Sequence, residues 1–231
     1  MRNVFLKNII IILILIFGLK NITFAQTNSD ELIISWEVNN FTPHEFTGKK
    51  LASPGSNISV SFDFIKNNKI VDLSKSKIYW YVNDELVSNS SGIKQINFIA
   101  PNQIGVPVDV RVELPDYEVL KTIEIPIVKP KIVIDAPFPK KEVYQNNFEV
   151  NLLPYFFNLP ANSVEEDPTA FLNVNWQINR NPAKPANENP FKLKIFVNSN
   201  EKTNINIKAF INNISKELEF TDKEVDITFV K

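Results

Sequence analysis

Apolar and polar residues alternate along most of this chain of 231 residues. Residues 57–65, NISVSFDFI, place an isoleucine, a valine and two phenylalanines at every second position. A period of two puts alternate side chains on opposite faces of a strand, one face buried and the other towards solvent. The same alternation recurs at 77–83, 106–114, 119–128, 148–156, 172–179, 191–198, 205–212 and 224–230. Helical periodicity is nearly absent after residue 30, so the sequence predicts an all-β fold.

Turn-forming residues bound these runs at short intervals. Clusters of Asn, Pro, Ser, Asp and Gly lie between the predicted strands, as tight turns require. Short strands at a spacing of about 8–12 residues, with turn signals between them, are typical of a β-sandwich. The length of the chain suits two such domains of about 100 residues each.

The tryptophans divide the chain into two copies of one plan. The pattern Trp-x-(Val or Ile)-Asn occurs at Trp80 and at Trp176, and predicted strands follow the two tryptophans at matching offsets. Trp36 carries the same local pattern but falls on the first strand of the first copy, and we interpret that echo as coincidence. We therefore expect one domain at residues 30–129 and a second domain at residues 130–231.

The two domains are expected to join near Pro130. The surrounding segment, PIVKPKIVIDAPFP at 126–139, spaces prolines through extended chain, which suits an edge strand or a stiff linker. The sequence therefore predicts a short and fairly rigid connection.

A tryptophan on the third strand, buried between two sheets, is a hallmark of immunoglobulin-like sandwiches. In YWYVND around Trp80, with Ser91-Gly92 and INFIAP after it, and in WQIN at Trp176, the chain resembles tandem bacterial immunoglobulin-like domains of exported and cell-surface proteins. The resemblance covers about residues 31–231 and implies that both tryptophans are structural core residues. The chain departs from antibody-type domains because it has no cysteine pair between the sheets.

The first 25 residues have a different character. Basic residues precede an apolar run at 9–19, which is shorter than the roughly 20 residues that a membrane-spanning helix needs. Thr23 and Ala25 then supply small residues for a cleavage site, so residues 1–25 are expected to be a secretory signal peptide. An uncleaved signal anchor is the alternative, and it would be the only contact with a membrane. The mature chain is expected to be extracytoplasmic: secreted, periplasmic or at the cell surface.

Charge and cysteine content exclude several classes of function. The 25 basic and 26 acidic residues leave a net charge of −1, so no strong field attracts nucleic acid, and none is expected as a partner. The absence of cysteine excludes disulfides, thiolate zinc sites and cysteine nucleophiles. No cofactor is expected.

No catalytic signature is present either. His44 is the only histidine and lacks the partners that a general base or a zinc site requires, and the serine-rich segments at 53–56 and 88–92 are predicted to be turns. We therefore expect a non-enzymatic interaction or spacer protein of the cell envelope, whose partner is another envelope or extracellular protein. The alternative is a carbohydrate-binding module that grips polysaccharide through exposed aromatic side chains.

The candidates for partner binding are aromatic: Tyr79, Tyr81, Tyr155 and Phe157. The first two flank Trp80 and should point away from it, since neighbours on a strand face opposite ways. An unbroken strand would place the other two on one face and Phe156 on the other. The rings of this second pair serve either as an exposed platform or as packing between the domains, and the sequence favours packing, whereas the exposure of Tyr79 and Tyr81 stays open.

An acidic cluster is the candidate metal site. Glu165, Glu166 and Asp167 lie in the predicted loop NLPANSVEEDPTA, which this topology would place near the domain junction. Adjacent carboxylates are suitable calcium ligands. The alternative is a solvent-exposed loop whose charges contribute only to solubility. The spaced Asp/Asn pattern of a known calcium loop is missing, and the sequence favours the solvated loop.

Overall fold

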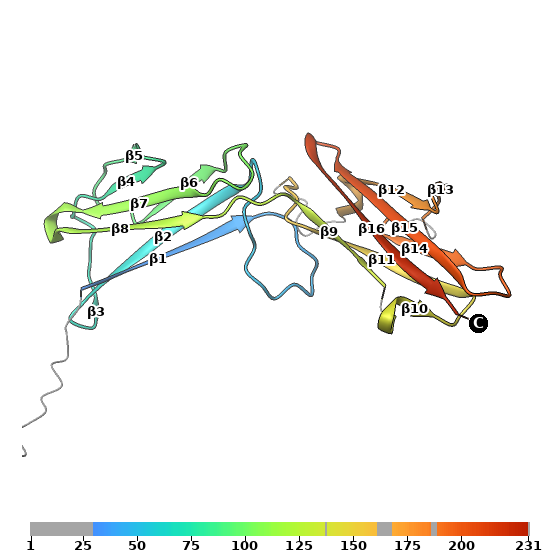
Figure 1. Ribbon diagram of the computed structural model, residues 1–231. Coiled ribbons are helices and arrows are strands. Elements are labelled where there is room, and N and C mark those ends of the chain that lie inside the picture. The colour runs from blue at the N-terminus through green and yellow to red at the C-terminus, as the bar shows by residue number, and fades with distance from the viewer. Residues whose placement is uncertain (1–29, 137, 161–167, 186–188, 231) are drawn as a thin grey trace, which may run out of the picture.

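The computed structural model describes residues 30–136, 138–160, 168–185 and 189–230. Within these residues the chain forms two β-sandwiches, one after the other (Figure 1). Each sandwich follows the immunoglobulin plan, in which strands A, B and E form one sheet and strands C, F and G form the other. The predicted all-β fold of two tandem immunoglobulin-like sandwiches is confirmed.

The first sandwich is built from the first eight strands. One sheet contains β1 (Glu31–Asn39), β2 (Asn57–Lys66), β3 (Lys69–Ile70) and β6 (Gln95–Ile99). The other contains, in spatial order, β5 (Glu85–Ser88), β4 (Tyr79–Val82), β7 (Val108–Leu114) and β8 (Val119–Ile125). All of these pairings are antiparallel, and β1 pairs with β2 from one end of β1 to the other.

The second sandwich repeats this arrangement with the remaining strands. One sheet contains, in spatial order, β14 (Lys192–Phe196), β11 (Asn147–Tyr155) and β9 (Lys131–Asp135). The other contains β10 (Glu142–Val143), β16 (Lys216–Phe229), β15 (Thr203–Asn213), β12 (Leu172–Ile178) and β13 (Asn181–Ala183). The described helical segments are single 3-10 turns at Pro115–Tyr117, Pro139–Lys141 and Pro168–Ala170.

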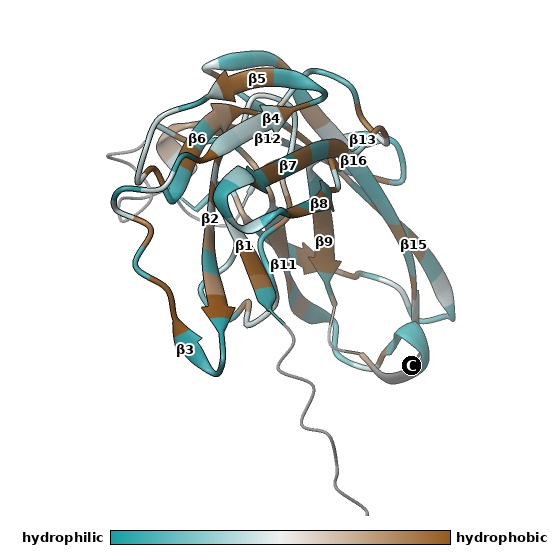
Figure 2. Cartoon of the chain, turned by 90° about the vertical axis from the view of Figure 1, so that its left-hand side faces the viewer, coloured by the Kyte–Doolittle hydropathy of each residue, from teal (hydrophilic) through white to brown (hydrophobic). Residues whose placement is uncertain are grey.

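Each sandwich has its own hydrophobic core between its two sheets. In β2 every second residue is buried, from Ile58 to Phe64, while the residues between them face outwards. Figure 2 shows this alternation as brown and teal bands along strands such as β2 and β7. The buried residues fall into two separate clusters, one within each sandwich.

The two tryptophans of the repeat occupy equivalent positions. Trp80 lies on β4 and is fully buried, and Trp176 lies on β12 with 3% of its surface exposed. Each indole Nε1–H donates a hydrogen bond of 2.8 Å to a backbone carbonyl just before the next strand of the opposite sheet, at Ile93 and at Pro190. The polar edge of each ring is thereby satisfied inside the core, as a buried tryptophan requires.

The asparagine of the repeated pattern has an equally consistent place. Asn83 and Asn179 each begin a two-residue hairpin turn, with φ values of 49° and 50°, and the residue after each also has a positive φ. Such turns match the twist of the flanking strands and favour asparagine. Each side-chain oxygen accepts the backbone N–H of the neighbouring strand, from Asp109 and from Asn206 respectively. The pattern therefore combines a core side chain with a turn residue.

Candidate functional site: the interdomain junction

Two of the candidate aromatic residues lie on the outer face of the first sandwich. Tyr79 and Tyr81 are half-buried on β4. The guanidinium of Arg111 lies 4.2 Å from the ring centroid of Tyr81, and the Lys77 amine lies 5.9 Å from that of Tyr79. A basic side chain thus lies near each of these half-buried rings.

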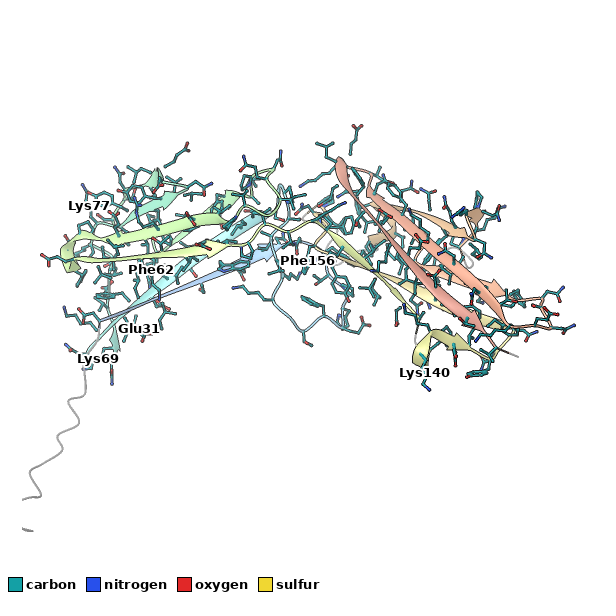
Figure 3. The ribbon with its side chains drawn as sticks, viewed as in Figure 1. Glu31, Phe62, Lys69, Lys77, Lys140 and Phe156 are labelled. Atoms are coloured by element: carbon teal, nitrogen blue, oxygen red, sulfur yellow. The ribbon has the colours of Figure 1, made fainter. Side chains whose placement is uncertain are left out.

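The other two candidates meet the first sandwich at the end of β11. The strand ends at Tyr155, and Phe156 has a φ of 65°, a left-handed conformation that turns the chain. The alternation expected through this segment is therefore wrong: Phe156 and Phe157 are both buried, 7% and 0% exposed, and Tyr155 is half-buried. Figure 3 labels Phe156 where the two sandwiches meet.

A loop of the first sandwich packs on this aromatic segment. Phe41 forms a short antiparallel bridge with it, in which Phe41 N–H donates to the Phe157 carbonyl and Phe156 N–H donates to the Phe41 carbonyl, each at 2.7 Å. The Phe46 ring meets the rings of Tyr155 and Phe156 at 5.6 and 6.0 Å, both edge to face. Phe41 also packs against the core of the second sandwich. The candidate cluster therefore serves interdomain packing.

Asn158 forms the polar half of the junction. Its side chain is 5% exposed, and its Nδ2 donates to the Ser53 hydroxyl at 3.1 Å and to the Pro54 carbonyl at 2.9 Å. Its Oδ1 accepts the Ser56 hydroxyl at 2.7 Å. The Ser53 hydroxyl in turn donates to the Phe156 carbonyl at 2.7 Å. One residue of the second sandwich thus bonds to three residues of a single turn in the first.

That turn has the geometry its sequence favours. Ser53-Pro54-Gly55-Ser56 closes with a backbone hydrogen bond from Ser56 to Ser53, and Gly55 has a φ of 75°. Proline at the second position and glycine with positive φ at the third are the residues of a type II turn. The predicted turn at 53–56 is confirmed, and both of its serines are buried against the second sandwich.

A buried carboxylate completes the network from the second sandwich. Glu219 is 7% exposed, and its Oε1 accepts Asn158 backbone N–H at 2.9 Å and Nδ2–H at 2.8 Å. Its Oε2 accepts Nδ2–H of Asn213, whose side chain is fully buried. Burial raises the pKa of Glu219 above its usual range, although the hydrogen bonds and the nearby Lys216 act in the opposite direction.

An irregularity in the β15–β16 hairpin places this carboxylate. Asn213 pairs with Lys216 and Asn212 pairs with Phe220, so residues 217–219 bulge out of the ladder. A bulge of this kind re-aims side chains, and here Glu219 points into the junction while its neighbour Leu218 is 90% exposed. The Lys216 amine donates to the Gly55 carbonyl at 3.1 Å, so the hairpin also touches the first sandwich.

The remaining candidates of the sequence are the acidic cluster and the single histidine. Glu165, Glu166 and Asp167 lie outside the described residues. Within the part of the chain that is described, no group of three or more His, Cys, Asp or Glu side chains is arranged to hold a metal ion. His44 is exposed in a turn of the loop that carries Phe46.

Sequence reasoning missed Asn158, Asn213 and Glu219. Asn158 and Asn213 lie beside predicted strands and Glu219 lies between two of them, where a polar residue is normally assigned to the solvent side. Asn158 lies 55 residues from Asn213 and 61 from Glu219, and the fold brings it to this pair. The sequence does contain one local signal. Asn158 directly follows three aromatic residues, so it is a polar residue in a segment that is expected to be buried.

Comparisons with known proteins show a likeness in fold alone. No protein-family model matches the chain, and no curated protein matches it. Three N-terminal domains of the highly immunogenic outer capsid protein of bacteriophage RB49 are similar at 9% identity, over 87% of this chain and 59% of that one, with a TM-score of 0.41. The chain thus spans less than two thirds of that structure.

Two further structures are similar at lower scores. Fibronectin(III)-like modules of CbhA from Clostridium thermocellum share 16% identity over 86% of this chain and 94% of that chain, with a TM-score of 0.28. A C-terminal 282-residue fragment of intimin, in complex with an intimin-binding domain of its translocated receptor, shares 11% identity over 85% of this chain and 63% of that one, with a TM-score of 0.29. None of the described segments is a helix long and apolar enough to cross a membrane.

Proposed function

We propose that this chain is a non-enzymatic interaction or spacer protein of the cell envelope, exported by a signal peptide at residues 1–25. Its two immunoglobulin-like domains, joined near Pro130, are held in one relative orientation. The observation that carries the proposal is the interdomain junction, in which Asn158 bonds to both domains inside a buried network. The partner is another envelope or extracellular protein.

The energetics of the junction support a fixed orientation. Domains within one chain move relative to each other by default, unless their interface is extensive and apolar. Here Phe41 and Phe46 bury aromatic surface, while the polar groups around Asn158 bond to each other only as long as the domains stay together. Water replaces these partners when the domains separate, so each hydrogen bond contributes a net of about 0.5–1.5 kcal/mol to the closed junction.

The connection between the domains restricts them further. β8 ends at Ile125 and β9 begins at Lys131, with prolines at positions 126 and 130 in the segment between them. Proline fixes one backbone angle and stiffens a linker. Two stiff units joined in this way hold whatever is bound at one end at a set distance from the other.

The alternative of a carbohydrate-binding module receives less support. It relied on Tyr79, Tyr81, Tyr155 and Phe157 as an exposed platform. Phe157 is fully buried, and Tyr155 packs against Phe46, so the second pair belongs to the junction. The first pair is half-buried, with basic side chains close to its rings.

Spin-label distances across the junction test the proposal. Because the chain contains no cysteine, exposed Thr122 in the first domain and exposed Lys194 in the second can be replaced by cysteine and labelled selectively. We expect one narrow distance distribution by pulsed electron paramagnetic resonance. Asn158→Ala in the same labelled background should broaden that distribution while the circular dichroism of the strands persists. A broad distribution in the chain with Asn158 intact would overturn the fixed orientation.

A further inference from the structure

A group of exposed side chains beside the junction has no assigned role. We name it the hairpin patch and define it by its residues: Ile104, Lys129, Glu217, Leu218 and Phe220. Its three apolar members are 55%, 90% and 44% exposed, in chain order. They line a groove of about 660 Å³ with one wall from each domain and with Pro130 among its lining residues. A groove with apolar lining and a few charged groups is a candidate interaction surface.

The bulge at residues 217–219 is what creates the protruding part of the patch. It leaves these residues out of the pairing between β15 and β16 and turns Leu218 outwards. The same bulge aims Glu219 into the junction, so it has a structural role in the single chain. Covering Leu218 with another surface would remove its side chain from water, which is favourable for a leucine.

We propose that the hairpin patch is the contact surface of a homodimer, in which Leu218 of each protomer enters the groove of the other. A two-fold pairing brings the same surface of two chains together, so that surface has to be complementary to itself. The hairpin patch fulfils this in chemistry, because the exposed Leu218 is itself one of the apolar residues that line the groove.

The charges of the patch are also complementary to each other. Lys129 and Glu217 both line the groove, and neither forms an ion pair with another described residue. The Lys129 amine lies 5.3 Å from the ring centroid of Phe220, at the rim where a second protomer would approach. In the proposed pairing, Lys129 of one protomer faces Glu217 of the other. A purely acidic or purely basic partner would satisfy only one of these charges.

The inference rests on the proposed function, because the groove exists only while the junction holds its two walls together. The Gly55 carbonyl, on the wall from the first domain, accepts the Lys216 amine from the hairpin. Loss of the fixed orientation would therefore remove the dimer surface as well.

Sedimentation velocity of the exported protein over a concentration series tests the dimer. We expect a monomer–dimer equilibrium, and Leu218→Asp should weaken it by at least about 30-fold, as loss of an interface hot spot does. Leu120→Asp is the matched control, because Leu120 is 66% exposed on β8 and lies outside the patch. Both leucines are exposed, so both variants should keep the circular dichroism of the unaltered protein.

A charge exchange tests the orientation of the two protomers. Lys129→Glu and Glu217→Lys should each weaken the dimer, and the double variant should restore it, because the two-fold axis then pairs the exchanged charges. A protein that stays monomeric at every concentration would overturn the proposal, including one that binds only polysaccharide or a different protein. A dimer that Leu218→Asp leaves intact, or an equal loss of dimer affinity in Leu120→Asp, would overturn it as well. So would a double variant whose dimer affinity stays as low as that of the single variants. A narrow spin-label distribution in a monomeric protein would refute the dimer and leave the proposed function standing.

Discussion

At the scale of single residues, each sandwich depends on one buried indole. Trp80 and Trp176 fill equivalent positions in the two cores, whereas Trp36 is partly buried and its ring lies 3.6 Å from the Lys49 amine. Trp80→Ala should lower the free energy of unfolding by about 3–5 kcal/mol through loss of packing and the cavity left behind. Trp36→Ala should lower it by less, about 1–2 kcal/mol.

Urea unfolding followed by far-ultraviolet circular dichroism measures both changes. This signal reports strand content and does not depend on the indole that each variant removes. An equal loss for the two variants would contradict the interpretation of the Trp36 pattern as coincidence.

The buried carboxyl of Glu219 gives a pH-dependent prediction at the same scale. Its pKa is raised in the folded protein, mainly by burial, so folding favours the protonated form. Its contribution to the free energy of unfolding is therefore present at acid pH, below the unfolded pKa, and is lost as the pH rises through the higher folded pKa. Glu219→Gln removes this titration, although its amide lowers stability overall by leaving a donor of Asn158 or Asn213 without an acceptor.

The measurement compares the unfolding free energy of the two proteins in steps from about pH 4 to pH 8. The unaltered protein should lose stability relative to the Gln variant as the pH rises across the interval. Parallel profiles would show that Glu219 titrates alike in the folded and unfolded chains, and the burial argument would then fail.

At the scale of elements, the hairpin turns explain the asparagine in the repeated pattern. Asn83 and the residue after it both have positive φ, which costs about 1–2 kcal/mol for most residues and little for glycine. Asn83→Ala should therefore be less stable than Asn83→Gly by about that amount. Both variants lose the same side-chain bond to Asp109, so the comparison isolates the backbone. Thermal unfolding measures it, and two variants of equal stability would contradict a strained turn.

The strands were predictable from the sequence because their signal is local. Alternation and turn residues depend on neighbours a few positions away, and both tryptophans lie within such runs. At the start of β16, alternation no longer predicts which side chains are buried. Alternation would pair Leu218 and Phe220 as inward residues, yet both face outwards and Glu219 is buried between them.

The cause of that exception lies outside the strand. Glu219 is held by Asn158 and Asn213, and Asn158 is held by a turn in the other domain. The contacts of Asn158 join positions 61 and 104 residues apart and leave no periodic trace in the sequence. The polar half of the junction could therefore not be predicted from the sequence. Its aromatic half, at Tyr155 and Phe157, was a candidate for partner binding or interdomain packing.

At the scale of the whole molecule, the junction and the hairpin patch act together. The patch takes one wall from each domain, so the proposed pairing of two protomers depends on the interdomain orientation. β1 begins at Glu31 and runs towards the junction (Figure 1), so the N-terminal end of the first sandwich lies away from the patch. A chain retained at its N-terminus would still expose the patch to a second protomer.

Whether the chain is retained there depends on residues 1–25. If they are a signal peptide, the protein recovered outside the cytoplasm after expression of the full chain begins at Gln26, as intact mass and N-terminal sequencing would show. Ala25→Arg places a long charged side chain at the cleavage position, where small residues are required, and should leave the precursor in the membrane fraction. Recovery of the unaltered chain in that fraction, with residues 1–25 attached, would favour the signal anchor. In that case the proposed dimer would form between chains tethered to one membrane, where confinement raises their effective concentration and favours pairing.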